Sequence, residues 1–141
     1  MKVLVAIDGS KYALRALKYA IKLVGRMNEP GELLLVNAHD DIALRGASQF
    51  VGKTAIKDYL DDLSQGEMQS AINAATKAGV SFKTRMLRGQ VAQSIAKAAA
   101  DEKCDLIVLG SKGRTALKDL LIGSVAQRVA SLSDIPVTLV K

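Results

Sequence analysis

Asp-Leu-Ile-Val-Leu-Gly-Ser-Lys-Gly-Arg, residues 105–114, is the stretch that decides the fold class of this chain. The run from Leu106 to Leu109 is apolar without interruption, which is typical of a strand buried on both faces of a parallel sheet. A loop containing glycine and basic residues follows at once, and a helical pattern begins at Ser124. Strand, polar loop and helix in this order are the repeating unit of α/β proteins.

The same alternation extends over the whole chain. We expect strands at residues 2–8, 32–39, 80–88, 105–110 and 136–140, and helices near residues 10–27, 52–78, 90–103 and 124–131. Ser10 can cap the first helix, and Gly79 can end the second in a left-handed conformation. Alternating strands and helices imply a parallel sheet with right-handed crossovers. The sequence therefore predicts a single domain over residues 1–141, with one doubly wound, Rossmann-like five-stranded parallel sheet (order 3-2-1-4-5) and helices on both faces.

This strand order places the first and fourth strands side by side where the winding of the sheet reverses. In doubly wound sheets the ligand crevice lies at this point, beyond the carboxyl ends of the strands. The chain leaves these two strands through Asp8-Gly9-Ser10 and through Gly110-Ser111-Lys112-Gly113, its most polar glycine-bearing strand exits. The strand at residues 80–88 alternates polar and less polar residues, which predicts an edge strand with one solvent-exposed face.

Composition indicates an ordinary globular protein. Of the 141 residues 49% are hydrophobic and 24% are charged. The apolar run after Met1 is too short for a signal peptide, and no run approaches the roughly 20 apolar residues of a membrane helix. Cys104 is the only cysteine, so an internal disulfide is impossible and a reducing compartment is the simplest location. We therefore expect a cytoplasmic protein without membrane contact.

The net charge of +6 favours anionic partners in general. Much of the excess has a structural explanation, because basic residues recur at helical spacing between apolar ones in the first helix: Lys11, Arg15, Lys18, Lys22 and Arg26. This pattern predicts the solvated face of an amphipathic helix. A nucleic-acid stripe is the less favoured interpretation, since only Tyr12 and Tyr19 offer aromatic surface nearby.

The glycines of the fourth strand exit have a second group downstream, in the pattern Gly110-x2-Gly113-x9-Gly123-Ser124. Glycines allow close approach of a ligand to backbone amides, and a helix beginning at Ser124 offers further amides and its dipole. Ser124 and Gln127 fit a capping box. Two such turns brought together would clamp a polyphosphate. The spacing is neither that of a Walker loop nor that of a dinucleotide fingerprint, and from these residues alone ordinary turn glycines remain an equal alternative.

The two-part glycine pattern resembles the ATP-binding signature of the universal stress protein family, in its nucleotide-binding subgroup. The flanking sequence agrees, as do Asp8-Gly9-Ser10, Arg88-Gly89 and the apolar ending from Pro136 to Val140. The resemblance covers essentially the whole chain. It implies a stress-response protein that binds ATP or another adenine nucleotide (AMP or ADP), with or without Mg²⁺. It also implies a homodimer. The last predicted strand, Pro136–Val140, is short, apolar and at a sheet edge, which invites pairing with its copy in a second chain. We expect a regulatory module whose loops are read by an unknown protein partner.

The resemblance also implies a site, residue by residue. Gly110, Gly113, Gly123, Ser124 and Val125 match the stretch that contacts phosphates and ribose, and Ser111, Lys112 and Arg114 fill its variable positions. A cation at Lys112 or Arg114 would offset phosphate charge, with solvated loop charges as an equal alternative. Asp8 matches the acid that contacts the nucleoside, or else holds its own turn. Ala38 matches the position that reads the adenine edge, and Ala6, Ile7 and Leu109 would supply apolar walls.

Other reactive residues indicate little catalysis. His39 and Cys104 are each unique, which excludes a multi-His or multi-Cys metal site; we expect His39 at the crevice rim and Cys104 in the core. Asp119 is better interpreted as a solvated loop charge than as a catalytic acid, so we predict no catalytic residues. The residues from 40 to 51 form either a lid or a surface loop. A slow nucleotide hydrolase or transferase, and a dimeric interaction protein with an empty loop, remain the alternatives.

Overall fold

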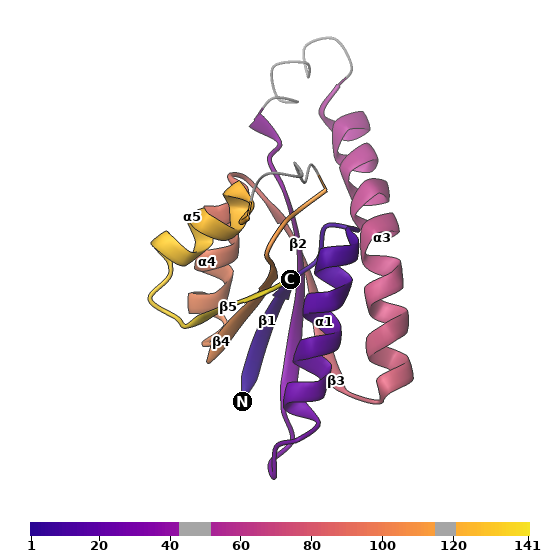
Figure 1. The fold of residues 1–141 in the computed structure, drawn as a ribbon. Coiled ribbons are helices and arrows are strands. Elements are labelled where there is room, and N and C mark those ends of the chain that lie inside the picture. Colours follow the sequence, from indigo (N-terminus) through magenta and orange to yellow (C-terminus); the bar gives the residue numbers. More distant parts are fainter. Residues whose placement is uncertain (43–51, 115–120) are drawn as a thin grey trace.

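The computed structural model describes residues 1–42, 52–114 and 121–141, which form a five-stranded parallel sheet covered by helices (Figure 1). The order is β3-β2-β1-β4-β5, which confirms the predicted fold class and strand order. Asp119 and nearly all of the segment from 40 to 51 lie outside the described residues, so their interpretations remain predictions. The elements are β1 (Lys2–Ala6), α1 (Lys11–Val24), β2 (Glu32–His39), α3 (Lys53–Ala78), β3 (Ser81–Arg88), α4 (Val91–Asp101), β4 (Leu106–Gly110), α5 (Ser124–Leu132) and β5 (Val137–Val140).

Element boundaries follow local sequence signals. Ser10 caps α1, because its hydroxyl oxygen accepts a hydrogen bond from the Ala13 N–H at 3.1 Å. Gly79 ends α3 in the left-handed region, with a φ of 67°. Both predictions are confirmed. The strand β1 ends at Ala6, two residues before the predicted end, so Ile7 and Asp8 belong to the strand exit.

Each face of the sheet carries its own core, as expected where side chains alternate along a strand. Val3 and Val5 of β1 pack with α1 and α3 on one face, whereas Leu4 packs with α4 and α5 on the other. Figure 1 shows these helix pairs on opposite sides of the sheet. Cys104 is 6% exposed and belongs to the second core, which confirms its predicted burial. The winding therefore reverses between β1 and β4, as the strand order requires.

The two edge strands differ from the buried centre. At the β3 edge, Phe82 packs against the first core and Leu87 against the second, but the residues from Lys83 to Met86 are exposed. The prediction of one exposed face is therefore wrong for this stretch: both faces are exposed, since α3 and α4 do not fully cover it. All four residues of β5 are partly exposed. None of the described helices is long and apolar enough to cross a bilayer.

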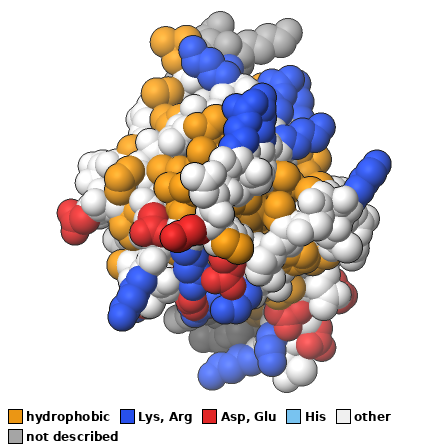
Figure 2. Space-filling view, turned by 90° about the horizontal axis from the view of Figure 1, so that it is seen from below, with side chains coloured by type: hydrophobic (Ala, Val, Ile, Leu, Met, Phe, Trp, Pro, Cys, Tyr) orange, Lys and Arg blue, Asp and Glu red, His pale blue; other side chains and the backbone are white. Residues whose placement is uncertain are grey.

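The positive charge lies on solvated surface. All five basic residues of the predicted α1 face are exposed, as expected for an amphipathic helix. At the end of the molecule where the strands begin, acidic and basic side chains are mixed (Figure 2). There Lys2 Nζ lies 2.7 Å from Glu102 Oε2, and Lys83 Nζ lies 3.1 Å from Glu32 Oε1. These pairs balance charge locally, opposite the end that carries the candidate site.

Candidate functional site

A cavity of about 420 Å³ lies at the carboxyl ends of β1 and β4, where the winding reverses. Its size falls in the range of about 300–1,000 Å³ that is common for small-molecule sites. It is lined by every predicted site residue except Ser111: Ala6, Ile7, Asp8, Ala38, Leu109, Gly110, Lys112, Gly113, Arg114, Gly123, Ser124 and Val125. Four lining residues were not predicted from the sequence, because their helical spacing is that of core positions: Ala13, Val91, Ile95 and Ala126.

Ser111 holds the glycine loop in place from beneath. It is 3% exposed. Its backbone N–H donates to the Val140 carbonyl at 2.8 Å, and its own carbonyl accepts from the Gly123 N–H at 2.7 Å. Ser111 therefore ties the end of β4 to β5 and to the start of α5. This departs from the expectation of a ligand-facing residue, because sheet pairing and loop contacts bury the serine.

The two glycine turns meet, as the sequence analysis required for a clamp. A Cβ atom added to Gly123 would lie 3.3 Å from Lys112 Cα and 3.5 Å from the Gly113 nitrogen. The separation from Lys112 Cα is tighter than most Cβ contacts, so a side chain at residue 123 would require the first turn to give way by a few tenths of an ångström. The backbones of both turns therefore border the same cavity.

The start of α5 is arranged differently from the prediction. Gly123, in an extended conformation, is the N-cap residue, and it has no side chain with which to cap the helix. The predicted capping box of Ser124 and Gln127 is therefore wrong, because Ser124 is already inside the helix. Gln127 Nε2 instead donates to the Ile122 carbonyl at 3.2 Å. No side chain of the described residues accepts a hydrogen bond from the first-turn amides of α5, which suits an anionic ligand.

Asp8 has two roles in the structure. Its Oδ1 accepts a hydrogen bond from the Ser10 N–H at 2.9 Å, so it holds its own turn. Its Oδ2 faces the glycine loop, since a Cβ atom on Gly113 would lie 3.2 Å from it. The carboxylate also lines the cavity. The turn-holding interpretation is therefore confirmed, and it leaves the second oxygen available to a ligand's donors.

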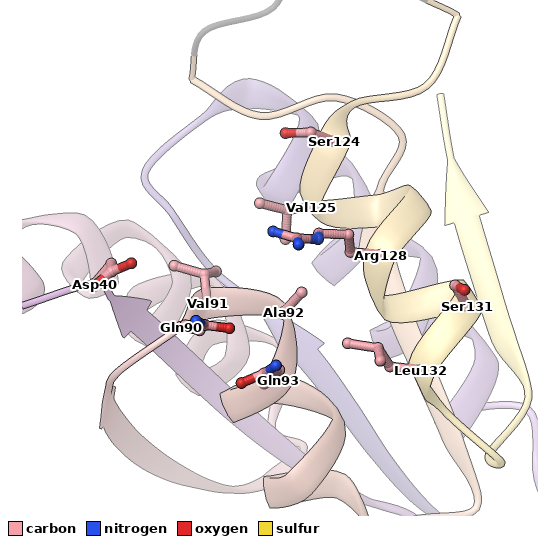
Figure 3. Close-up of a pocket in the computed structure, with 10 residues that line it drawn as sticks. All are labelled: Asp40, Gln90, Val91, Ala92, Gln93, Ser124, Val125, Arg128, Ser131 and Leu132. Carbon is pink, nitrogen blue, oxygen red and sulfur yellow. The ribbon is translucent and has the colours of Figure 1, made fainter. Parts of the chain in front are cut away.

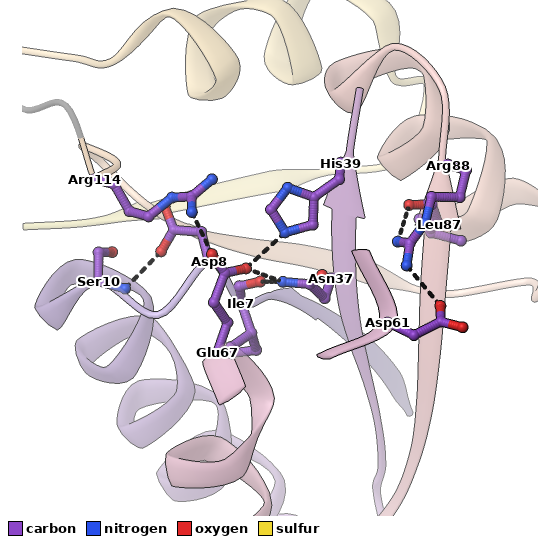
Figure 4. Close-up of polar contacts among 10 residues, drawn as sticks. All are labelled: Ile7, Asp8, Ser10, Asn37, His39, Asp61, Glu67, Leu87, Arg88 and Arg114. Atoms are coloured by element: carbon purple, nitrogen blue, oxygen red, sulfur yellow. Dashed lines mark hydrogen bonds and ion pairs between the residues drawn. The ribbon is translucent and has the colours of Figure 1, made fainter. Parts of the chain in front are cut away.

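The two loop cations differ in their partners. Arg114 Nη1 forms an ion pair with Glu67 Oε1 of α3, and Figure 4 shows the guanidinium pointing at that carboxylate. Lys112 has no ion-pair or hydrogen-bond partner among the described residues. The sequence does not indicate a role for Glu67, because it is one of several acidic residues in a 26-residue helix and nothing local distinguishes it from a surface charge.

His39 is more buried than predicted. It is 8% exposed and its Nε2 lies 2.8 Å from Glu67 Oε2, so it belongs to a buried polar cluster. It does not line the cavity, and the expectation of a rim residue is therefore wrong. The cause is α3, whose Glu67 covers the exit of β2. Among the described residues there is no group of three or more His, Cys, Asp or Glu side chains arranged to hold a metal ion.

A second cavity, of about 400 Å³, lies between the start of α4 and α5 (Figure 3). It shares Val91, Ser124 and Val125 with the first cavity. In Figure 3 the Arg128 side chain reaches from α5 toward α4, and Gln90 stands across from it. The two cavities therefore adjoin at the start of α5.

The fold and the cavity define a doubly wound α/β protein with a glycine-lined site at its switch point. Comparison with known proteins agrees: the chain belongs to the universal stress protein family, whose model matches residues 1–141. Universal stress protein MJ0531 of Methanocaldococcus jannaschii is 34% identical to it over 99% of this chain and 81% of the relative.

Solved structures show the same fold. The structure of hypothetical protein MJ0577, also from Methanocaldococcus jannaschii, superposes with a TM-score of 0.86 at 29% identity, covering 99% of this chain and 94% of that one. A universal stress protein in complex with cAMP has a TM-score of 0.69 at 24% identity and covers 100% and 97% of the two chains. An Arabidopsis thaliana family member with AMP bound has a TM-score of 0.68 at 18% identity, with coverage of 100% and 91%.

Proposed function

We propose that this chain binds ATP or another adenine nucleotide, such as AMP or ADP, in the cavity between β1 and β4. One observation carries the proposal: the two glycine turns meet at the cavity, and Asp8 faces Gly113 across it. Backbone amides of such turns and of an uncapped helix start are ligands for phosphate. The structures with cAMP and with AMP bound support it, since they hold an adenine nucleotide on the same fold.

The phosphates, the ribose and the adenine of the ligand would each contact a different part of the cavity. The phosphates would lie on the turns at Gly113 and Gly123–Ser124, with Lys112 as a cation that has no other partner among the described residues. Oδ2 of Asp8, which accepts no hydrogen bond from the described residues, suits the paired hydroxyl donors of ribose. The adenine would lie against apolar walls at Ala6, Ile7, Ala38 and Leu109. Mg²⁺ would be held mainly by the phosphates and water, as is common for this ion.

Calorimetric titration tests the proposal. The protein is unfolded, freed of carried-over ligand and refolded, and ATP with Mg²⁺ is titrated into it, with GTP as the matched control. We expect micromolar binding of ATP that GTP does not reproduce. If competently refolded protein binds no adenine nucleotide, the glycine turns are structural and the chain is better described as an interaction protein with an empty loop. Steady release of phosphate at saturating ATP would instead favour a slow hydrolase.

We further propose that the chain works as a homodimeric regulatory module of the stress response in the cytoplasm. The dimer would form through β5, a short edge strand that begins at Val137, directly after Pro136. The carbonyls of Pro136 and Val140 accept bonds from β4, so the backbone groups of Val137 and Leu139 point away from it, as the alternation of a parallel ladder requires. No strand among the described residues pairs with these outward groups, and such an edge invites pairing with a second copy.

Sedimentation equilibrium tests the dimer. We expect a mass twice that of the 15.0-kDa chain. Leu139→Pro removes one outward N–H while leaving the carbonyl contacts of Pro136 and Val140 to β4, and we expect it to shift the equilibrium toward monomer. A wild-type mass of one chain at tens of micromolar would rule out the β5 dimer. Nucleotide binding is measured separately, so either proposal can fail without the other.

A further inference from the structure

We propose that Glu67 holds Arg114 in the nucleotide-free protein, and that the phosphates of a bound nucleotide compete with Glu67 for the Arg114 guanidinium. Glu67 would thereby lower the affinity for nucleotides with several phosphates. It acts through Arg114 and is a positioning residue, since it does not itself line the cavity. The inference rests on the proposed function, because it concerns how the same cavity distinguishes ATP from AMP.

The carboxylate of Glu67 is the fixed partner in this contact. Its side chain is 9% exposed, and its Oε2 accepts a hydrogen bond from Asn37 Nδ2 at 2.7 Å. The same oxygen lies 2.8 Å from His39 Nε2. Asn37 Nδ2 also donates to the Ile7 carbonyl at 2.9 Å, which anchors the group to the end of β1. Figure 4 shows Asn37 and His39 of β2 converging on this one carboxylate.

Arg114 is the partner that can move. Its side chain is 49% exposed, and it follows Gly113 directly on the loop that borders the cavity. The contact between Nη1 and Glu67 Oε1 holds the guanidinium toward α3, so the guanidinium must turn away from Glu67 to meet a ligand in the cavity. A guanidinium binds phosphate in the same forked geometry as carboxylate, so a phosphate chain in the cavity is a direct competitor of Glu67.

The competition should depend on the number of phosphates. Lys112 has no partner among the described residues and is free to meet a first phosphate, whereas Arg114 must first leave a buried carboxylate. AMP can therefore bind without displacing Arg114. ATP gains the second cation only by breaking the ion pair, and among the described residues Glu67 then keeps Asn37 and His39 as partners. Part of the attraction between Arg114 and the phosphates is thus offset in the wild-type protein.

The experiment compares the dissociation constants of ATP and AMP in four proteins: wild type, Glu67→Gln, Arg114→Ala and the double variant. The glutamine side chain keeps the size of Glu67 and an oxygen for Asn37, but it removes the charge that holds Arg114. We expect the Glu67→Gln protein to bind ATP on the order of three- to tenfold more tightly than wild type, because one charged competitor for Arg114 is lost. The change in AMP affinity should be clearly smaller. In the Arg114→Ala background the same substitution should leave ATP affinity nearly unchanged.

Asp61→Asn is the matched control. Asp61 lies on the same helix and pairs with Arg88 at 3.0 Å, so the substitution makes an equal change of charge in an ion pair whose carboxylate is more exposed and which does not line the cavity. It should not alter the ratio of ATP to AMP affinity. Should Glu67→Gln not fold, Glu67→Asp withdraws the carboxylate from Arg114 by one methylene and gives the same comparison.

Weaker ATP binding by Glu67→Gln would overturn the inference, because it would mean that Glu67 orients Arg114 toward the phosphates. An equal gain in the Arg114→Ala background would overturn it too, since that is the result of simple charge repulsion. If wild type binds ATP and the substitution changes nothing, only this inference fails. If wild type binds neither nucleotide, the proposed function fails and the competition fails with it.

Discussion

Gly110 lies in direct contact with Tyr12: a Cβ atom added to the glycine would be 2.8 Å from the carbonyl carbon of Tyr12 and 2.8 Å from its Cβ. Gly110 ends β4 and Tyr12 lies in the first turn of α1, so this contact joins the two strand exits that border the cavity. An added Cβ atom would therefore clash with the backbone and the Cβ atom of Tyr12. The helix fixes these atoms, so they cannot rotate aside as the end of a flexible side chain can. The first glycine of the motif is therefore required by the fold itself.

Gly110→Ala should destabilise the protein by about 1–3 kcal/mol, the usual range for a methyl group forced into close packing. We would measure the free energy of unfolding in urea by circular dichroism. A loss of nucleotide binding in this variant would not identify Gly110 as a ligand contact, because the loop moves with the helix. Unchanged stability would show that α1 can withdraw from β4 at little cost.

Gly66→Ala should raise the free energy of unfolding in the same urea experiment, whereas Gly110→Ala should lower it. Gly66 lies inside α3, is exposed, and has no atom within 4 Å of the place where a Cβ would be built. Its φ is not positive, so alanine can adopt the same backbone conformation. The substitution should stabilise the protein by about 0.5–1 kcal/mol, because glycine is the poorer helix former. A decrease in stability would mean that this part of α3 does not remain helical in solution.

Gly113→Val should abolish nucleotide binding while leaving the fold intact. The nearest atom to a Cβ on Gly113 is Asp8 Oδ2 at 3.2 Å, so the added methyl groups would enter the space between the loop and Asp8. The phosphates are proposed to occupy that space. Titration with ATP and a urea unfolding curve on the same sample test both parts. Binding equal to that of wild type would show that the phosphates lie elsewhere.

The fold was predictable because its signals are local. The apolar runs of the five strands and the residues Ser10 and Gly79 act over a few neighbours, and the observed sheet has the predicted order. The place of the cavity was predictable because parallel strands bring their exits to one edge, whereas its individual lining residues were implied by the family resemblance and the helical ones were missed. Glu67 was not predictable: its role arises only when α3 places it over the end of β2. Ser124 failed as a cap because Gly123 took that position.

Asn37→Ala should destabilise the protein by about 1–3 kcal/mol, even though it removes only one small side chain. Asn37 is 1% exposed, and its Nδ2 donates both to the Ile7 carbonyl and to Glu67 Oε2. Alanine would leave both acceptors with one partner fewer in a buried place. Ala75→Gly, at another fully buried position but without polar contacts, is a control for the general cost of core substitution. A loss for Asn37→Ala below about 0.5 kcal/mol would show that water replaces the amide.

Cys104 should react slowly with thiol reagents as long as the protein is folded. The thiol is 6% exposed, and burial raises its pKa above the ordinary value, so the reactive thiolate is scarce. We expect alkylation at pH 8 to be at least about tenfold slower than in urea, measured by mass spectrometry. The same shift makes stability fall at alkaline pH: the unfolded thiol ionises from about pH 8.5, before the folded one, and the folded state then binds more protons. Cys104→Ser, which does not ionise in this range, should remove that component of the pH dependence. Equal alkylation rates in both states would mean that α4 and β4 open readily around this residue.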